Sequence, residues 1–340
     1  MANTKINYAD KIEKILVELP DFVSDFIYNF GRAQNYATKY QYVRDIKDFL
    51  QFMVNYMPEH SEKSLREITL SDMDAVQPIS INRYMTLLTG DEGNGCKLTT
   101  VKRRRASLSS MYGFFLVNNA VKTNPVLATK PVKIPEKNVI YLTNEEQKLL
   151  LETIRTGDKL SDSTAKVHNL YADRDSAMFL LMLDTGLRVS EMIETNIIDY
   201  DFKKCSVVVR RKGGDVQNVY YSDECAEYLD HYFSSQRLRY GLPDKDIPAF
   251  STTTGKRLGV RAVETLVKKY VEACIPEKTR LISPHKLRSS FAMSFYEASG
   301  NDILLLQKKL NHKSIQTTNI YAKASDQALK ESRGLLQGRR

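Results

Sequence analysis

The sequence lacks the usual patterns for metal binding and for disulfide bonding. Its four cysteines lie far apart and form no C-x-x-C pair, and its five histidines include no H-E-x-x-H motif. Isolated cysteines of this kind are typical of reduced thiols in a cytosolic protein. We therefore expect no disulfide, no metal site and no cofactor.

Long apolar runs are missing as well. No stretch of about 18 consecutive apolar residues occurs, and the N-terminal sequence MANTKINYADKIEK is charged where a signal peptide would be apolar. The chain also has no glycine-rich phosphate loop, internal repeat or low-complexity tract. These absences predict a soluble, cytoplasmic protein that makes no membrane contact.

What the sequence does contain is enough apolar material for two folded cores and an excess of positive charge. A length of 340 residues with 42% apolar residues predicts two domains. Lysine and arginine total 50 against 41 acidic residues, which gives a net charge of +9 and a pI of about 9.1. Such a balance favours a nucleic-acid partner, although many basic proteins bind none.

The first half of the chain has the spacing of amphipathic helices. Pro20 begins a segment in which apolar side chains recur at helical intervals, namely Phe22, Phe26, Ile27 and Phe30. A second helix is expected in YQYVRDIKDFLQFM, with one apolar face made of Tyr42, Ile46, Phe49, Leu50 and Met53. INRYMTLLT, after Ser80, predicts a third helix, which the glycine-rich loop GDEGNGCKL separates from a fourth.

The fourth helix, VKRRRASLSSMYGFFLV, carries four cations in its first turns: Lys102, Arg103, Arg104 and Arg105. Thr99 or Thr100 is expected to cap it. Cations near a helix start oppose the helix dipole, and a polyanion bound alongside would relieve that conflict. We therefore predict that these four side chains contact DNA phosphates. From this helix alone, a solvated basic face stays open as the alternative.

The segment from Asn124 to Ile140 contains three prolines and several lysines, which predicts an extended connector between domains. A new helix begins directly after it, with Thr143 and Glu146 in capping-box spacing. Further on, CSVVVRR and VQNVYYS flank a Lys-Gly-Gly-Asp turn, a pattern that predicts a β-hairpin. TGDKLSDSTAKVHNLYADRD is polar and is expected to be a surface loop. The predicted fold class is therefore mainly α with a small antiparallel sheet.

Four separated pieces of the second half carry residues suited to phosphate chemistry. Arg188 follows a glycine that can end a helix in the left-handed conformation, and Lys212 stands at the hairpin tip. Ser283 and Pro284 are expected to begin a helix on which His285 and Arg288 share a face near the positive end. LNHKSIQTTNIY holds His312 and Tyr321, with Ser314 as the cap of a last helix and Tyr321 two turns into it.

Together these pieces resemble the tyrosine recombinase family of phage integrases and Xer proteins. The family's T-G-L-R-x-S-E block is matched from Thr185 to Glu191, and its G-K-G-type turn loosely by Arg211-Lys212-Gly213. Its H-x-L-R block is matched from His285 to Arg288, and its L-G-H-x-S-I-x-T-T-x-x-Y block from Leu310 to Tyr321. In the first half, ATKYQYVRDIKDFLQF and TTVKRRRASLSSMYGFF look like the family's helical, SAM-like core-binding domain.

The sequence departs from the family pattern at a few positions. Asn311 replaces a glycine, but asparagine also tolerates a left-handed helix cap, so the turn should survive. Ser289 stands where histidine is common, which leaves the other blocks intact. Asp215 and Gln217 replace basic residues that often follow the hairpin turn, which weakens the expected local grip on the DNA backbone.

The resemblance implies a role for each matched residue. Tyr321 is the nucleophile that becomes a phosphotyrosine, Arg188 and Arg288 clamp the phosphate oxygens, and Lys212 is the general acid. His285 and His312 contact the phosphate and assist proton transfer. Glu191 is expected to orient Arg188 through a salt bridge, whereas the remaining histidines that match nothing, such as His168 and His231, are assigned no role.

The resemblance also implies an organisation and an activity. The core-binding domain is expected over residues 1–123, a linker over 124–141, the catalytic domain over 142–322 and a C-terminal tail over 323–340. The tail is expected to dock on a neighbouring protomer. The expected partners are a double-stranded DNA recombination site and further copies of the chain, a dimer on each site and a tetramer in the synapse.

The expected activity is site-specific recombination through a 3′-phosphotyrosine and a Holliday junction. Its purpose, chromosome dimer resolution or mobile-element integration and excision, stays open. The short segment before the first expected helix leaves no room for an arm-site domain, which favours a simple, single-partner Xer-like enzyme. Two alternatives stay open from the residues alone: DNA relaxation by a type IB topoisomerase, and DNA binding by a regulator without catalysis.

Overall fold

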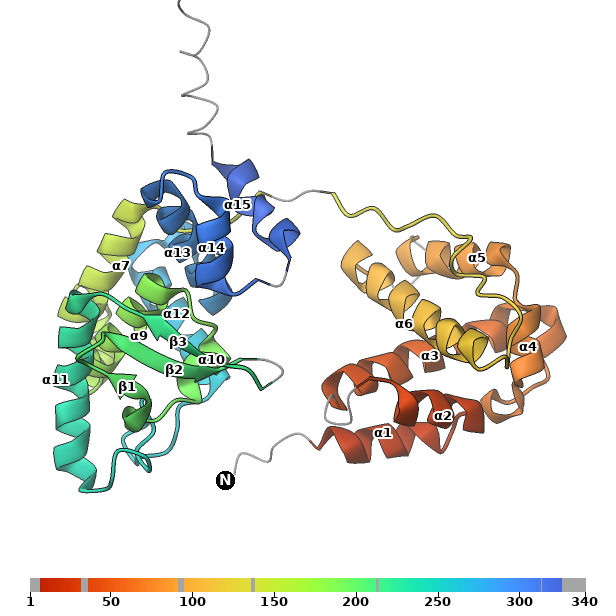
Figure 1. Cartoon of the computed structure of the whole chain (residues 1–340), viewed down its shortest axis with the longest axis horizontal. Helices are drawn as coiled ribbons and strands as arrows, with labels where there is room; N and C mark the ends of the chain where they lie inside the picture. The colour runs from red at the N-terminus through yellow and green to blue at the C-terminus, as the bar shows by residue number, and fades with distance from the viewer. Residues whose placement is uncertain are drawn as a thin grey trace, which may run out of the picture. The chain divides into compact units, whose positions relative to one another are not determined.

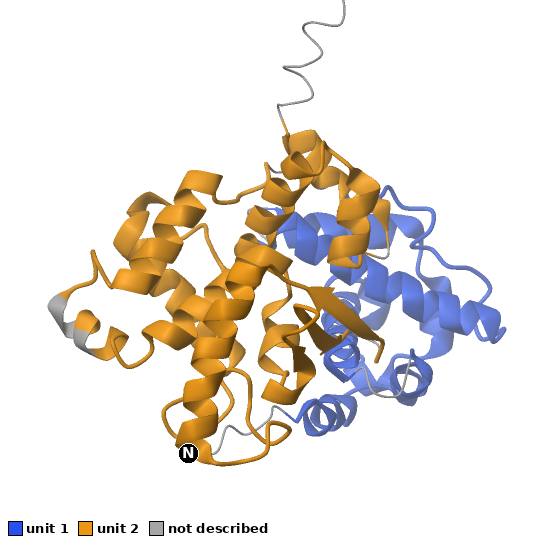
Figure 2. Cartoon of the chain, turned by 60° about the vertical axis from the view of Figure 1, so that its left-hand side comes forward, with its two compact units in different colours: residues 1–136 blue, residues 137–340 orange. Residues whose placement is uncertain are grey.

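The computed structural model describes residues 7–31, 36–90, 95–135, 138–211, 214–312 and 314–325. The chain divides into two compact units, residues 1–136 and 137–340, coloured separately in Figure 2. Both units are built mainly of helices, and the second adds a three-stranded antiparallel sheet. The predicted fold class is therefore confirmed. No described helix has the length and apolar character needed to cross a membrane.

The first unit is entirely helical in its described part. Its elements, in red to yellow in Figure 1, are α1 (Tyr8–Leu16), α2 (Asp21–Asn29), α3 (Tyr36–Tyr56), η1 (Pro58–His60), η2 (Leu65–Glu67), α4 (Leu70–Ala75), α5 (Pro78–Thr89) and α6 (Leu98–Val117). The apolar face predicted for α3 is present, since Ile46, Phe49, Leu50 and Met53 are fully buried. Sequence spacing missed α1, whose buried face is only Ile12 and Leu16.

Helix α6 begins earlier than predicted, so the expected threonine cap is wrong. Lys97 takes the extended N-cap conformation, and its carbonyl accepts bonds from the amides of Thr100 and Val101 at 2.8 and 3.1 Å. Thr99 and Thr100 therefore lie inside the first turn. Leu108, Met111 and Tyr112, further along the helix, pack in the core of the first unit.

The predicted connector is partly packed. Val126 is fully buried in the core of the first unit, and the Asn124 side chain donates to the carbonyl of Ser109 at 3.0 Å. Beyond Thr129 no regular element occurs among the described residues until the second unit begins its first helix. The division between the compact units, after residue 136, falls within the segment expected to link two domains.

The described part of the second unit contains nine α-helices, three short 3-10 helices and the sheet. Its elements, from yellow-green to blue in Figure 1, are α7 (Asn144–Thr156), α8 (Asp162–His168), α9 (Ala172–Thr185), α10 (Val189–Ile193), η3 (Ile197–Asp199), β1 (Tyr200–Asp201), β2 (Ser206–Arg210), β3 (Val216–Tyr220), α11 (Asp223–Tyr240), α12 (Val260–Cys274), η4 (Pro276–Lys278), α13 (Pro284–Ala298), α14 (Ile303–Leu310), η5 (Ile315–Thr317) and α15 (Asn319–Ala324). Helix α9 lies at the centre, with its side chains from Ala177 to Met182 almost all inaccessible.

Three local predictions in the second unit are confirmed. Thr143 and Glu146 form the predicted capping box of α7. The predicted hairpin is β2 paired antiparallel with β3, and opposite Val207 and Val219 are both buried against the core. Ser283 holds the N-cap position of α13, as expected, but its side chain makes no capping hydrogen bond.

Two local predictions are wrong. The polar segment expected to be a surface loop contains α8 and the start of α9, and His168 is buried with its Nδ1 atom 3.1 Å from the Tyr270 hydroxyl. That partner lies about a hundred residues away, so local periodicity gives no sign of it. The last helix is also split: Ser314 caps η5, and Tyr321 is the third residue of the separate α15.

Candidate active site

The candidate site begins where α9 ends. Gly186 caps α9 in the left-handed conformation, with φ of +62°, as the sequence predicts. A Cβ atom at this position would lie 2.3 Å from Cδ1 of Phe291, so both the backbone angle and the space require glycine. The turn places Arg188 at the N-cap of α10, with its side chain 43% exposed.

Glu191 holds Arg188 in place. One carboxylate oxygen accepts from the Arg188 guanidinium at 2.8 Å, and the other accepts from the Arg188 backbone amide at 3.1 Å. The predicted ion pair is therefore present, and Glu191 is itself buried. Arg257 donates to the carbonyl of Ile193, the last residue of α10, at 2.5 Å and to the carbonyl of Thr195 at 2.7 Å, so α10 is fastened at both ends.

Arg288 joins the Arg188 turn to the end of α14. Its guanidinium donates to the carbonyl of Gly186 and, at 2.7 Å, to the carbonyl of Leu310. The side chain is only 3% exposed, and burial, with Arg188 as the second cause, lowers the pKa of Arg288 to about 10. The group still carries its charge at neutral pH. Two of its five N–H donors are used by these carbonyls, which leaves donors for an anion.

His312 follows the left-handed cap of α14 at Asn311, where φ is +50°. The expectation that asparagine preserves this turn is confirmed. His312 Nδ1 lies 3.0 Å from Oγ1 of Thr318, which fixes the imidazole plane. Burial lowers the pKa of His312 to about 4, and Arg288, Arg188 and His285 add to the effect. The ring is therefore neutral at physiological pH.

His285 lies on the first turn of α13, three residues before Arg288, and is exposed. Partial desolvation lowers the pKa of His285, and the cations of Lys286, Arg288 and Arg188 lower it further. The charges of Arg188 and Arg288 therefore lower the pKa of both His285 and His312. The mutual influence of these groups shows that they share one site.

Tyr321 completes the cluster from α15. Its side chain is 3% exposed and packs with Phe291 and Met293 of α13 and Leu306 of α14. Tyr321 also contributes, after burial and the charged groups nearby, to the electrostatic environment of Arg288. Figure 1 shows α13, α14 and α15 side by side at one end of the second unit.

The structure thus brings together five of the residues expected from the sequence as catalytic: Arg188, His285, Arg288, His312 and Tyr321. Lys212, the sixth, lies outside the described residues, as does the tail after residue 325. No group of acidic, histidine or cysteine side chains suited to a metal ion occurs in the described ranges.

Three further residues shape the site and were not singled out by the sequence. Thr318 orients His312, Arg257 fastens the end of α10, and buried Arg211 shares Glu191 with Arg188. Thr318 lies within the matched block, so its position offered a signal. Arg211 was noted only as part of the turn, and nothing in the sequence marked Arg257.

The cations expected to bind DNA in the first unit have internal partners. Arg103 pairs with buried Asp45, Arg104 pairs with Asp48 at 2.8 Å, and Arg105 donates to the carbonyl of Val126 at 2.8 Å. Lys102 differs, since it is exposed and forms no ion pair with the described part of the chain.

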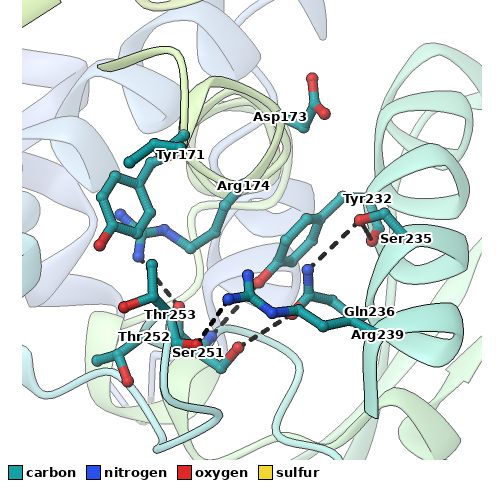
Figure 3. A pocket seen from close by; sticks show the side chains of 11 residues that line it. Tyr171, Asp173, Arg174, Tyr232, Ser235, Gln236, Arg239, Ser251, Thr252 and Thr253 are labelled. Atoms are coloured by element: carbon teal, nitrogen blue, oxygen red, sulfur yellow. Dashed lines mark hydrogen bonds between the residues drawn. The ribbon is translucent and has the colours of Figure 1, made fainter. Parts of the chain in front are cut away.

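The second unit also has a polar pocket, and none of the expected site residues lines it. Figure 3 shows Arg174, Gln236 and Arg239 around Ser251. Their polar atoms bond to one another: Arg174 donates to the Ser251 carbonyl at 3.0 Å, and the Ser251 hydroxyl donates to Gln236 at 3.2 Å. Arg239 donates instead to the carbonyl of Thr253, at 2.8 Å.

A tyrosine beside two arginines and two histidines, on a helical unit with a small hairpin, is the arrangement that the resemblance to tyrosine recombinases implies. The sequence model of the phage integrase family matches residues 141–328, more than half of the chain. The chain therefore belongs to the phage integrase family and is a site-specific tyrosine recombinase. A topoisomerase or a regulator without catalysis is not favoured.

Individual proteins agree with this assignment. The chain is 29% identical to tyrosine recombinase XerC of Caldanaerobacter subterraneus subsp. tengcongensis, over 93% of this chain and 86% of that protein. It is 26% identical to tyrosine recombinase XerS of Streptococcus thermophilus, over 92% and 94%. The fold matches XerH bound to its palindromic difH substrate with a TM-score of 0.67, at 18% identity, over 98% of this chain and 90% of that one.

Proposed function

We propose that the chain recombines DNA by forming a 3′-phosphotyrosine at Tyr321. The observation that carries this proposal is the position of Tyr321 beside Arg288, in a cluster that contains two neutral histidines and an excess of arginine. A tyrosine ester of phosphate keeps the energy of the broken bond, so rejoining needs no nucleotide cofactor.

The proposed step is a transesterification. The Tyr321 oxygen attacks the phosphorus, a bond forms between them, and the bond to the 5′ oxygen of the next nucleotide breaks. A neutral histidine, His312 or His285, accepts the tyrosine proton. Lys212 donates a proton to the departing 5′ oxygen, which leaves as a hydroxyl group. The reverse reaction with a new 5′ hydroxyl joins the strands.

Arg188 and Arg288 stabilise the charge that builds on the phosphate oxygens. Their planar guanidinium groups match phosphate geometry better than a lysine does. Arg288 is fixed by two carbonyls and Arg188 by Glu191, so both are oriented before DNA arrives. Orientation in advance avoids the cost of reorganisation during the reaction.

DNA binding extends beyond this site in the proposal. Residues 1–123 act as the core-binding domain, residues 124–141 as a basic linker and residues 142–322 as the catalytic domain. Lys102 contacts a phosphate, because it is exposed and unpaired among the described residues. Arg103, Arg104 and Arg105 instead act mainly by holding α6 to its neighbours, which fixes where Lys102 stands.

The proposed assembly is a dimer on each DNA site and a tetramer in the synapse, with exchange through a Holliday junction. The tail from residue 323 docks on a neighbouring protomer. We place the reaction in the cytoplasm. The relatives named XerC and XerS favour a Xer-like enzyme, for which we propose chromosome dimer resolution as the purpose, with mobile-element integration or excision as the second candidate.

The test identifies the target sequence and the nucleophile together. Purified protein is incubated with a library of duplexes that are nicked at the centre and randomised on both sides of the nick. The nick lets the short fragment that carries the new 5′ hydroxyl group diffuse away, so the strand joined to Tyr321 through its 3′ phosphate stays on the protein through denaturation. The adducts are recovered and sequenced, and a defined substrate is made from the enriched sequence.

Wild-type protein is expected to yield adducts that converge on one site, and Tyr321→Phe is expected to yield none. Tyr296→Phe is the matched control, because Tyr296 packs in the same apolar cluster as Tyr321 and the substitution removes the same hydroxyl group. It should form adducts like wild type. Adducts from Tyr321→Phe at the wild-type level would show that another residue is the nucleophile.

A further inference from the structure

One buried arginine near the site has no part in the proposed reaction. Arg211 directly follows β2, and its side chain is only 4% exposed. It stands at the first glycine of the family's turn pattern, so the resemblance assigns it no role. Burial lowers the pKa of Arg211, Glu191 opposes this effect, and Arg188 adds to it. Because a buried charge is costly unless it is paired, the partners of Arg211 indicate what it can do.

Arg211 shares one carboxylate with Arg188. Nη1 of Arg211 donates to Oε2 of Glu191 at 2.5 Å, and Nη1 of Arg188 donates to Oε1 at 2.8 Å. The Glu191 side chain is itself 5% exposed, and no other cation in the described part of the chain pairs with it. Two positive charges therefore face one negative charge, and one positive charge is left over.

The charge left over is available at Arg188. The Arg188 side chain is 43% exposed, whereas that of Arg211 is almost inaccessible. Arg211 also directs its Nε atom to Oε1 of Gln217, on the neighbouring strand β3, at 3.1 Å. A phosphate can therefore contact Arg188 but not Arg211. Without Arg211, Glu191 would face Arg188 alone, and that pair would be close to neutral toward an anion.

The charge of Arg211 also acts on the second arginine of the proposed clamp. After burial, the pKa of Arg288 is lowered by Arg188, raised by Glu191 and lowered by Arg211. Arg211 and Glu191 thus act on Arg288 with opposite sign. Salt screens buried and partly buried charges much less than exposed ones, so this balance persists at physiological ionic strength.

We infer that Arg211 is a positioning residue that keeps the phosphate clamp cationic. It pairs with one oxygen of Glu191, so that Glu191 orients Arg188 without cancelling the charge that Arg188 offers to the phosphate. The inference rests on the proposed function, because it concerns the phosphate of that reaction. At an effective dielectric constant of about 20, the loss of one such charge changes the rate by roughly 10- to 30-fold.

Restoring the charge separates this role from a structural one. Arg211→Met removes the buried cation and leaves Glu191 facing Arg188 alone. Glu191→Gln in the same chain then removes the negative charge and keeps one acceptor oxygen for Arg188. If Arg211 acts through charge, the second substitution should recover part of the rate. If Arg211 acts only through packing, the second substitution removes a further contact and should lower the rate again.

Single-turnover formation of the covalent adduct is measured at saturating protein, on the site recovered from the library. Arg211→Met should be roughly 10- to 30-fold slower than wild type. The double variant Arg211→Met, Glu191→Gln should be roughly fivefold or more faster than Arg211→Met. Glu191→Gln alone should be slower than wild type, because Arg188 loses the charge that orients it. The same substitution is thus expected to slow cleavage in one background and to accelerate it in the other.

Two control variants separate charge from the structure of the hairpin. Gln217→Leu removes the contact between Arg211 and β3 and keeps the charge of Arg211, so its rate should stay within about threefold of wild type. Arg210→Met removes an exposed arginine one position away that forms no ion pair in the described part of the chain, and it should do the same. A loss for Gln217→Leu as large as that for Arg211→Met would show that Arg211 acts by holding the hairpin, which overturns the inference.

Thermal unfolding of every variant shows whether a loss of rate comes from a loss of fold. Arg211→Gln, a neutral side chain that can still donate to Glu191, carries the same expectations where Arg211→Met does not fold. Glu191→Gln that slows cleavage in both backgrounds, with wild type active, would overturn the inference and leave the proposed function standing. No adduct from wild type would instead contradict the proposed function.

Discussion

Arginines gather at two places in this chain, and the comparison shows that the same side chain can serve opposite purposes. In the second unit the group consists of Arg188, Arg211 and Arg288. In the first unit it consists of Arg103, Arg104 and Arg105 on α6. From the sequence alone, the group on α6 has the denser positive charge, because its three arginines are consecutive.

The carboxylates around the two groups leave the larger excess of positive charge in the second unit. On α6, Asp45 takes Arg103 and Asp48 takes Arg104, while Arg105 is used by Thr129 and the Val126 carbonyl. In the second unit, Glu191 is the one carboxylate in the described part of the chain that pairs with this group, and it pairs with Arg188 and Arg211 but not with Arg288. Cations therefore exceed acids there, and two histidines stay neutral under the same field.

We therefore expect an anion site where cations have their donors held in place but their charge not neutralised. Arg288 illustrates this, because carbonyl oxygens orient it without cancelling its charge. Arg103 and Arg104 of α6 are oriented by carboxylates, which cancel it. The comparison predicts that a change in the group around Arg288 alters chemistry and a change in the α6 group alters stability.

The largest expected effect is on cleavage. Arg188→Ala should slow formation of the covalent adduct roughly 100- to 1000-fold, because Arg188 acts mainly on charge that develops in the transition state. DNA affinity should change by less than about threefold, since one phosphate contact among many is lost. Single-turnover cleavage and equilibrium binding on the recovered site measure the two quantities. A loss confined to affinity would place Arg188 among ordinary phosphate contacts.

The next effect is on stability. Arg103→Met leaves the buried carboxylate of Asp45 without its main partner, and burial already raises the pKa of that group against the pull of Arg103. The free energy of unfolding should fall by about 2 kcal/mol, less than for a fully buried pair because Arg103 is partly exposed. Urea unfolding measures it, and Lys102→Met, one position away and exposed, is the control with no expected change.

A second substitution distinguishes this mechanism from a simple loss of packing. Asp45→Asn in the Arg103→Met background removes the unpaired charge and should recover most of the lost stability. The adduct yield at saturating protein should be near wild type in the double variant. No recovery would mean that Arg103 stabilises α6 through its contacts rather than through its charge.

These two groups also show how far the sequence alone could lead. Features defined within a few residues were predicted: the left-handed caps at Gly186 and Asn311, the capping box at Thr143, and the hairpin turn. Each depends on local backbone chemistry, which the residue types specify directly. The candidate site was predicted for the same reason, because each of its residues lies in a short block.

What the sequence could not provide are pairings between distant residues. Asp45 and Arg103 are 58 positions apart, and His168 and Tyr270 are 102 apart. The α6 cations therefore looked free, and the α8 segment looked like a loop, because the partner that explains each one is brought close only by folding. Arg211 was passed over in the same way, since its partner Glu191 lies on another element.

The smallest expected effect is the pH dependence of stability and of DNA affinity that His312 causes. The pKa of His312 is lowered to about 4 in the folded chain, from an ordinary value of about 6.5. As the pH falls from about 6.5 to 4, the unfolded chain therefore takes up this proton before the folded chain does, and the free energy of unfolding falls. A bound phosphate offsets the arginine field and raises the pKa of His312, so DNA affinity should rise over the same window.

His312→Asn should reduce the pH dependence of DNA affinity by roughly 1 kcal/mol, which is about fivefold in affinity. The effect is small because the half-buried ring is partly screened by solvent. Binding is measured in a Tyr321→Phe background, so that cleavage does not intervene. His231→Asn is the control, since His231 is 73% exposed and pairs with Asp173 away from the arginines. If His312→Asn keeps the full pH dependence of DNA affinity, His312 is not the group that takes up the proton on binding. The arginines would then act on the phosphate alone and not through the pKa of His312.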